Sequence, residues 1–111
     1  MIPQVRPGDF EEWVQGQPVR PVLLDVREPW ELQTASVQPD DVDVITIPMQ
    51  EIPARLAELP ADRPIACLCH HGMRSQRVAL FLAQQGYTDV ANIAGGIDAW
   101  SRERDSGVPV Y

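Results

Sequence analysis

The sequence IACLCHHGMRSQRVALFLAQQG, residues 65–86, decides the fold of this chain. Its apolar start ends at Cys69 and has the length of a buried strand, too short for a globular helix. Gly72 then permits a backbone turn that other residues resist. An apolar block at 78–83, which Gly86 closes, predicts a helix. The stretch therefore predicts a strand, a tight loop and a helix, with Cys69 at the carboxyl end of the strand.

This placement favours a reactive form of Cys69. Backbone N–H groups in a loop of this kind can converge on an anion, and the dipole of the following helix adds to their effect. Arg74 supplies a cation in the same loop, and a nearby cation favours the thiolate, which is the nucleophilic form of cysteine. The alternative is a small buried cysteine that ends a core strand, which is common.

Further elements are predicted on both sides of this stretch. Apolar runs predict strands at 22–26, 44–47 and 90–93, and the first has the pattern of a strand buried on both faces of a parallel sheet. Helices are predicted at 8–16, from Pro29 through Leu32, at 52–59 and at 97–100. Because strands alternate with helices, we expect an α/β fold with a mainly parallel sheet.

Two local features of the sequence make more specific predictions. Asp9 is a candidate N-cap of the first helix, with Glu12 three residues on as its capping-box partner. The polar segment 34–43 is irregular, and we expect it to be an exposed loop whose acids are solvated.

Length and composition narrow the class of protein. A chain of 111 residues predicts one domain with its own core. No apolar run is long enough to span a bilayer, and residues 1–6 lack the regions of a signal peptide, so we expect a cytoplasmic location. Two cysteines are too few for a disulfide framework, which agrees with a reducing compartment.

The charge of the chain excludes several functions. A formal net charge of −7 argues against nucleic acid or an anionic membrane as a partner. Every basic side chain other than histidine is arginine, so no lysine is available for Schiff-base chemistry or for a phosphate-binding loop.

Three motifs together resemble a known family. They are LDVRE at 24–28, CHHGMRS at 69–75 and GGIDAW at 95–100, followed by GVPV at 107–110. In this order and spacing they resemble a single-domain rhodanese, a sulfurtransferase. The resemblance covers nearly the whole chain and implies a single rhodanese domain at 1–111. The resemblance implies a central, mainly parallel sheet of about five strands flanked by helices on both faces. One departure is visible, because segment 34–43 lacks the His-Ile-Pro-Gly-Ala pattern that the family often carries there.

The resemblance implies a two-step transfer of sulfur without a cofactor. The Cys69 thiolate would take the outer sulfur from a donor such as thiosulfate and become a persulfide, and cyanide or a thiol would then remove that sulfur, with ping-pong kinetics. A protein could also be the sulfur acceptor. A sulfur carrier or a regulatory rhodanese module acting on a protein partner is the alternative.

The same resemblance assigns roles to individual residues. Arg74 would hold an anionic donor, since guanidinium suits oxyanions. Asp25 and Arg27 would brace the active-site loop. The loop would bind the substrate through a set of residues around the cysteine, namely His70, His71, Gly72, Met73 and Ser75.

For some of these residues a simpler interpretation stays open. Asp25 and Arg27 could be a solvated surface pair that adds little stability. His70 and His71 could line the donor entrance, where partly protonated imidazoles would favour anions, or could be exposed and inert. Arg77 could be a second anion contact or an ordinary surface residue.

Two other kinds of site fit the sequence less well. Cys67, Cys69, His70 and His71 offer four metal ligands, but structural zinc sites use two separated ligand pairs, so we predict no metal. Cysteine phosphatases place five residues between cysteine and arginine, whereas four separate Cys69 from Arg74. A non-catalytic module is disfavoured because both residues are present.

Overall fold

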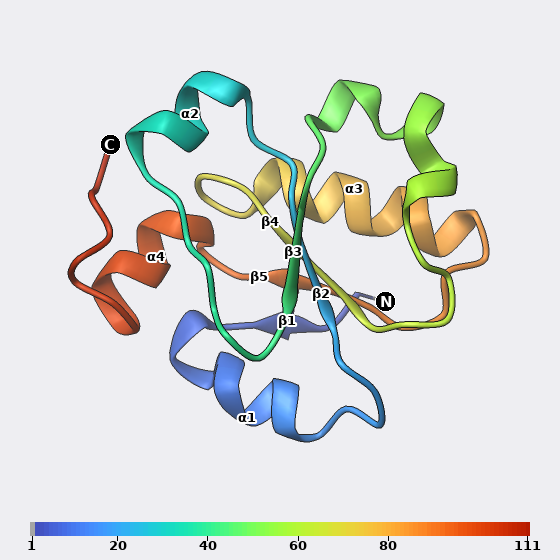
Figure 1. Cartoon of the computed structure of the whole chain (residues 1–111), viewed down its shortest axis with the longest axis horizontal. Helices are drawn as coiled ribbons and strands as arrows, with labels where there is room; N and C mark the ends of the chain where they lie inside the picture. The colour runs from blue at the N-terminus through green and yellow to red at the C-terminus, as the bar shows by residue number, and fades with distance from the viewer. Residues whose placement is uncertain (1) are drawn as a thin grey trace.

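A five-stranded sheet forms the centre of the molecule in the computed structural model, which describes residues 2–111. All its strands are parallel, in the order β1-β5-β4-β2-β3 (Figure 1). The strands are β1 (Gln4–Val5), β2 (Val22–Asp25), β3 (Asp43–Thr46), β4 (Ile65–Leu68) and β5 (Val90–Ile93). This arrangement confirms the predicted α/β class and parallel sheet.

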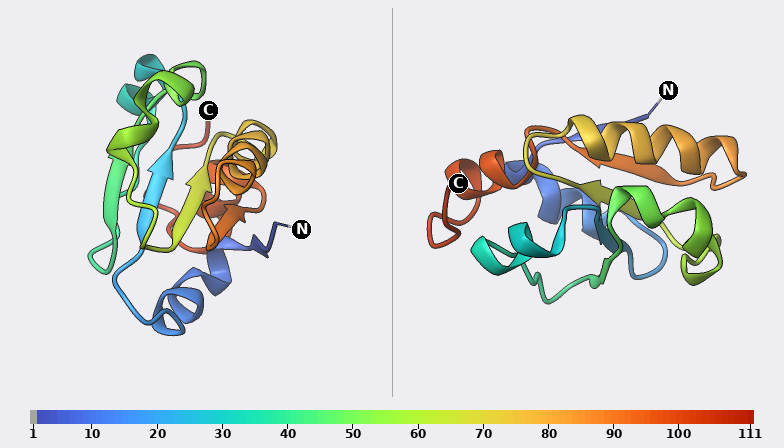
Figure 2. Two further views of the ribbon diagram at one scale, coloured as in Figure 1. Left: turned by 90° about the vertical axis from the view of Figure 1, so that its right-hand side faces the viewer. Right: turned by 90° about the horizontal axis from the view of Figure 1, so that it is seen from above.

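Helices cover both faces of this sheet (Figure 2). In chain order the helical elements are η1 (Pro7–Asp9), α1 (Phe10–Gln15), α2 (Pro29–Thr34), η2 (Met49–Glu51), η3 (Pro53–Glu58), α3 (Met73–Gln84) and α4 (Gly96–Glu103). One core cluster joins Leu24 and Cys67 of the sheet to α3 residues such as Leu82. The other joins Leu23 to Phe10 of α1 and Trp100 of α4. Alternate residues of β2 therefore face opposite cores, which explains its continuous apolar run.

The structure differs from the sequence-based predictions at strand β1 and at the helix expected at 52–59. β1 was not expected, because its two residues carry no pattern of their own and are ordered by pairing with Asn92 and Ile93. The helix expected at 52–59 is the 3-10 segment η3, which Arg55 interrupts with a φ of −114°. Because of this kink, the segment forms short 3-10 turns rather than a regular α-helix.

The predicted cap and the predicted loop also differ from the structure. Asp9 makes no side-chain capping bond, since η1 leads directly into α1; instead the Glu31 carboxylate accepts a hydrogen bond of 3.0 Å from the backbone N–H of Glu28 at the start of α2. Segment 34–43 is not uniformly exposed, because Ala35, Val37 and Val42 are buried in the second core.

The N-terminus of α4 lies against the loop that follows β4. The backbone N–H groups of Ile97 and Asp98 donate to the carbonyl oxygens of Cys69 and His70, at 2.8 and 3.1 Å. This approach requires glycine at position 96, where φ is +62° and an added Cβ would overlap both carbonyl oxygens. The packing of α4 thus fixes the backbone on which Cys69 sits.

We expect Gly96→Ala to lower stability by about 2 kcal/mol more than Gly86→Ala, because overpacking adds to backbone strain. Gly86 is the matched control, since its φ is +95° but an added Cβ meets no atom within 4 Å. Urea unfolding of both variants measures the difference. Equal losses in the two variants would show that the contact between α4 and the loop contributes nothing.

Candidate active site

Cys69 lies at the base of a small pocket at the carboxyl end of β4. The pocket has a volume of about 230 Å³ and is lined by Cys69, His70, His71, Met73 and Arg74. The cysteine is 1% exposed, so a reactant must enter this pocket to reach the sulfur. The sequence motif therefore does assemble into one concave site.

Two hydrogen-bonding groups face the Cys69 sulfur. The Gly72 backbone N–H donates to Sγ at 3.1 Å, and Ser75 Oγ lies 3.2 Å from it. Gly72 lies at the turn that the sequence predicted; its φ of +101° is left-handed, and it caps the N-terminus of α3. The N–H bond and the helix dipole both favour negative charge on sulfur. The sequence predicted that backbone N–H groups of this loop converge on an anion. Among the described residues, the Gly72 N–H is the one of these groups that donates to the sulfur.

Cys67 has the opposite environment. It is fully buried in β4, within the core cluster that α3 covers. Burial raises the pKa of its thiol well above the usual range, and the neighbouring Cys69 adds to the shift. It is therefore a neutral residue of the core.

Arg74 is held by a carboxylate that the sequence analysis missed. Its two terminal nitrogens donate to the two oxygens of Glu31 at 2.7 and 2.8 Å. Glu31 is buried, and the hydrogen bond from Arg74, together with one from Tyr111, lowers its pKa from 4.5 to about 2. The Arg74 side chain is 31% exposed at the pocket, but its charge is balanced by its partner.

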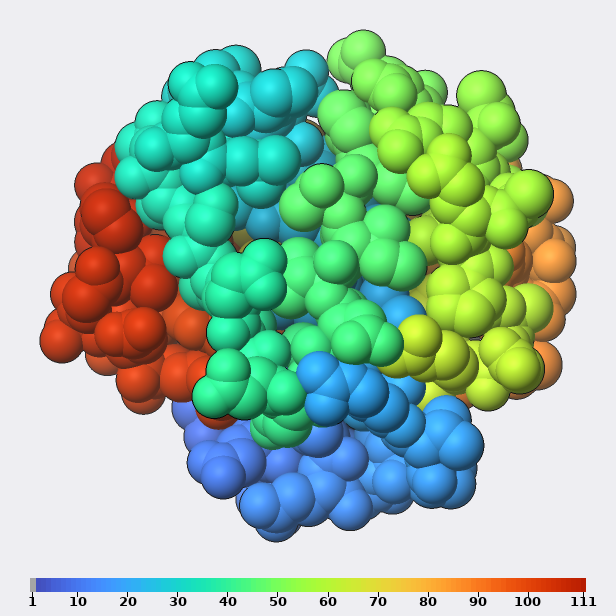
Figure 3. All heavy atoms as spheres, in the orientation of Figure 1, coloured from blue at the N-terminus to red at the C-terminus, as the bar shows by residue number. Residues whose placement is uncertain are grey.

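Asp25 and Arg27 form a buried pair, so a solvated surface pair is the wrong interpretation. Arg27 donates from Nε and Nη2 to the Asp25 carboxylate at 2.9 and 2.7 Å. It also donates to the carbonyl oxygens of Glu31 and Ala35, and to the Tyr111 hydroxyl. The pair joins the end of β2 to the carbonyl of Glu31 in α2, to Ala35 just after α2, and to the C-terminal segment, which lies beside α2 (Figures 1 and 3).

The two histidines differ in their surroundings. The His70 ring stacks on Tyr111 with centroids 3.8 Å apart, and its Nε2 lies 2.7 Å from the Tyr111 carbonyl oxygen. His71 stacks on the other side of His70 but is exposed. The interpretation of two exposed loop residues is therefore wrong for His70.

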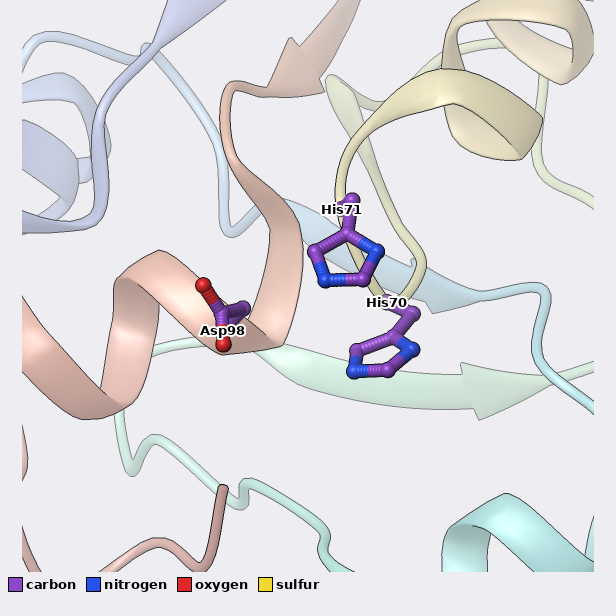
Figure 4. A group of neighbouring side chains, drawn as sticks. All are labelled: His70, His71 and Asp98. Atoms are coloured by element: carbon purple, nitrogen blue, oxygen red, sulfur yellow. The ribbon is translucent and has the colours of Figure 1, made fainter. Parts of the chain in front are cut away.

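His70, His71 and Asp98 bring ligand atoms within 4.8 Å of one another (Figure 4). Each of the three already has a partner in the fold: His70 bonds Tyr111, the two imidazoles stack, and Asp98 accepts from Arg102. Stacked rings also direct their in-plane lone pairs along parallel directions rather than toward one point. The cluster is thus explained without an ion, and the expectation of no metal stays a prediction.

Arg77 lies away from the cysteine pocket. It is exposed and lines two other hollows, beside Gln76 and beside Phe81. This position favours an ordinary surface residue over a second anion contact.

Sequence reasoning missed three residues that complete the site: Glu31, Asn92 and Tyr111. Asn92 carried a signal, since it is the one amide in an otherwise apolar buried strand. Glu31 and Tyr111 carried none, because their partners lie 43 and 80 residues away.

The Glu31 pair predicts a specific acid dependence. A carboxyl group whose pKa is lowered on folding stabilises the fold at every pH above its pKa in the unfolded chain, here near 4.5. This contribution to the free energy of unfolding disappears as the pH falls toward the pKa in the folded protein, about 2. We expect Glu31→Gln to cost about 2 to 4 kcal/mol at neutral pH, and the gap to wild type to narrow below about pH 4.5. Unfolding by urea across the pH range measures it, with Glu11→Gln on the exposed face of α1 as the control. A gap that is independent of pH would contradict this account.

No helix among residues 2–111 combines the length and the apolar character needed to cross a bilayer. This finding agrees with the absence of a spanning run in the sequence.

Comparison with known proteins identifies the family. The family model described as Rhodanese-like domain matches residues 6–103. A "Sulfurtransferase" of Allochromatium vinosum is 38% identical over 89 residues, which cover 80% of this chain and 77% of that protein. The "Thiosulfate sulfurtransferase GlpE" of Pseudomonas syringae is 34% identical over 79 residues, 71% of each chain.

A solved structure shows the same fold. The rhodanese-related protein of Thermoplasma volcanium superposes with a TM-score of 0.79 at 30% identity, over 98% of this chain and 99% of that one. Other curated relatives are much longer, and this chain spans about a fifth of two of them. The matched residues include the β4 strand, the cysteine loop and the whole of α4, so the chain belongs to the family of rhodanese-like domains.

Proposed function

We propose that the chain is a sulfurtransferase that carries a sulfane sulfur on Cys69. The observation that supports it most is the position of Cys69 Sγ, at the base of a small pocket and within hydrogen-bond distance of Gly72 N and Ser75 Oγ. Membership of the rhodanese-like family and the names of the two sulfurtransferase relatives agree with this assignment.

The proposed reaction has two displacements. The Cys69 thiolate attacks the outer sulfur of thiosulfate, a new S–S bond forms, the old one breaks, and sulfite leaves with its electron pair. A nucleophilic acceptor, cyanide or a thiol, then attacks the outer sulfur of the persulfide and restores the thiolate. The sulfane sulfur is transferred without net oxidation, so the protein needs no cofactor in this scheme.

The site residues have distinct proposed roles. The Gly72 N–H stabilises the anionic sulfur, and the pocket side chains of His70, His71 and Met73 surround the incoming donor. Asp25 and Arg27 support the site indirectly, because Arg27 bonds the Glu31 carbonyl and Glu31 holds Arg74.

Thiosulfate is the donor we propose first. It is the substrate in the name of one relative, and the Arg74 side chain is partly exposed and lines the pocket. Glu31 neutralises much of the arginine's charge, so we assign donor binding to hydrogen bonds at the pocket rather than to a strong positive field. A role as a sulfur carrier for a protein acceptor would use the same Cys69 persulfide.

Cys69→Ala should abolish sulfur transfer while leaving the fold intact, since it removes the nucleophile from a loop. Cys67→Ala is the matched control, and we expect it to retain activity within about threefold because that thiol stays buried and neutral. Thiocyanate formation from thiosulfate and cyanide measures both variants. Comparable activity in Cys69→Ala would end the proposal.

Arg74→Ala should lower kcat/KM for thiosulfate by about tenfold, the effect of losing one charged hydrogen bond. Alkylation of Cys69 by the uncharged reagent iodoacetamide should change less than about twofold, because it needs no anion contact. Arg77→Ala, one turn further along α3, should leave both rates unchanged. Equal losses in thiosulfate use and alkylation would give Arg74 a purely structural role.

A further inference from the structure

A buried chain of hydrogen-bonding groups leads from Cys69 to β5. Ser75 Oγ lies 3.2 Å from the Cys69 sulfur and 2.5 Å from Asn92 Oδ1. All three residues are at most 2% exposed, so no bulk water competes for these bonds. Asn92 does not line the pocket and has no part in the two displacements described above.

The orientation of the Asn92 amide is fixed by the backbone. Its Nδ2 donates to the Gly72 carbonyl oxygen at 3.1 Å and to Gln4 Oε1 at 2.9 Å. Turning the amide over would place Oδ1 against the Gly72 carbonyl, which has no hydrogen to donate. Asn92 Oδ1 therefore faces Ser75, and the short distance between the two oxygens is that of an O–H···O bond.

Ser75 has a single hydroxyl hydrogen for two acceptors. When Cys69 is a thiol, its S–H can donate to Ser75 Oγ while Ser75 donates to Asn92, and every group has a partner. When Cys69 is a thiolate, the hydrogen can go to the sulfur or to the amide oxygen, so either Asn92 Oδ1 has no hydroxyl donor or the charged sulfur keeps only the Gly72 N–H. An unpaired buried acceptor is costly, so the chain of bonds disfavours the thiolate.

We propose that Asn92 is a positioning residue that withholds the Ser75 hydrogen from the Cys69 sulfur. It thereby restrains the resting thiolate and favours the states in which Sγ carries no charge. One of these is the thiol. The other, which rests on the proposed function, is the persulfide, because its negative charge sits on the outer sulfur.

Other charged groups near the sulfur act alongside this bond. Arg74 with its partner Glu31, the imidazoles of His70 and His71, and Asp98 with Arg102 lie around the loop. Cys67 lies behind it in β4 and stays neutral. None of these groups hydrogen-bonds Asn92, so a change at Asn92 leaves them in place. Such a change also removes the bond to the Gly72 carbonyl, and the Ser75→Ala background separates that effect from the effect of the serine hydrogen.

The test is the pH dependence of Cys69 alkylation by iodoacetamide, with the peptide of Cys69 followed by mass spectrometry. Asn92→Leu has a similar size and cannot accept, so Ser75 is free to donate to sulfur. We expect the alkylation midpoint to fall by about half a pH unit or more, the equivalent of one hydrogen bond. In a Ser75→Ala background the same substitution should produce no shift, as a double-mutant cycle requires.

Two further variants make the test independent of how Asn92→Leu folds. Ser75→Ala alone should not raise the midpoint, since the hydrogen is already withheld from the sulfur and the substitution removes only the acceptor of the thiol S–H. Gln4→Ala removes the exposed partner of Asn92 but leaves the Gly72 bond, so it should produce no shift.

The opposite results would overturn the assignment. A rise of a full pH unit in Ser75→Ala would show that the hydrogen already serves the sulfur. An unchanged or raised midpoint in folded Asn92→Leu, or a shift that persists without Ser75, would do the same. Alkylation needs no sulfur donor, so these results are separate from a failure of the sulfur transfer itself.

Discussion

The structure around Cys69 depends on satisfying the backbone polar groups of one buried loop. The loop after β4 receives several of its hydrogen bonds from segments far away in the chain. The carbonyls of Cys69 and His70 accept from α4, and the carbonyl of Gly72 accepts from Asn92 of β5. Buried N–H and C=O groups without partners would each cost free energy comparable to a lost hydrogen bond. The glycine at 96 is a consequence of this requirement, and the amide at 92 adds a second donor to the Gly72 carbonyl beside the Gln76 N–H.

Ion pairs between charged side chains also hold the start of α3, which follows the loop, against α2. Arg74 reaches from α3 to Glu31 of α2, and Glu31 also accepts from the Tyr111 hydroxyl. Arg27, paired with Asp25, contacts both α2 and Tyr111. The pocket is therefore bordered by paired charges, and its preference for an anionic sulfur comes mainly from the Gly72 N–H and the start of α3.

The sequence was informative where local pattern and local structure coincide. The apolar runs of β2, β4 and β5 and the turn at Gly72 were all predicted, because each depends on residues next to one another. Strand β1 could not be, since two residues become a strand only by pairing with Asn92 and Ile93. Pro53 indicated a helix start correctly, but the helix type was wrong, because the segment forms 3-10 turns with a kink at Arg55.

The site was predicted in the same uneven way. The cysteine and its loop follow from a contiguous motif, whereas Glu31, Asn92 and Tyr111 reach it only through tertiary folding. Arg74 shows the consequence most clearly: as a sequence residue it is a free cation, and in the fold it is half of a bidentate pair. A partner carboxylate 43 residues away leaves no trace in the local pattern.

The central claim is that Cys69 carries the transferred sulfur, and intact mass measures this most directly. The protein is incubated briefly with thiosulfate, and half of the sample is then treated with cyanide. The account predicts a gain of one sulfur atom that cyanide removes and that Cys69→Ser does not show. A gain of the same size in Cys69→Ser, or a wild-type protein that gains no sulfur from thiosulfate or from a persulfide donor, would contradict it.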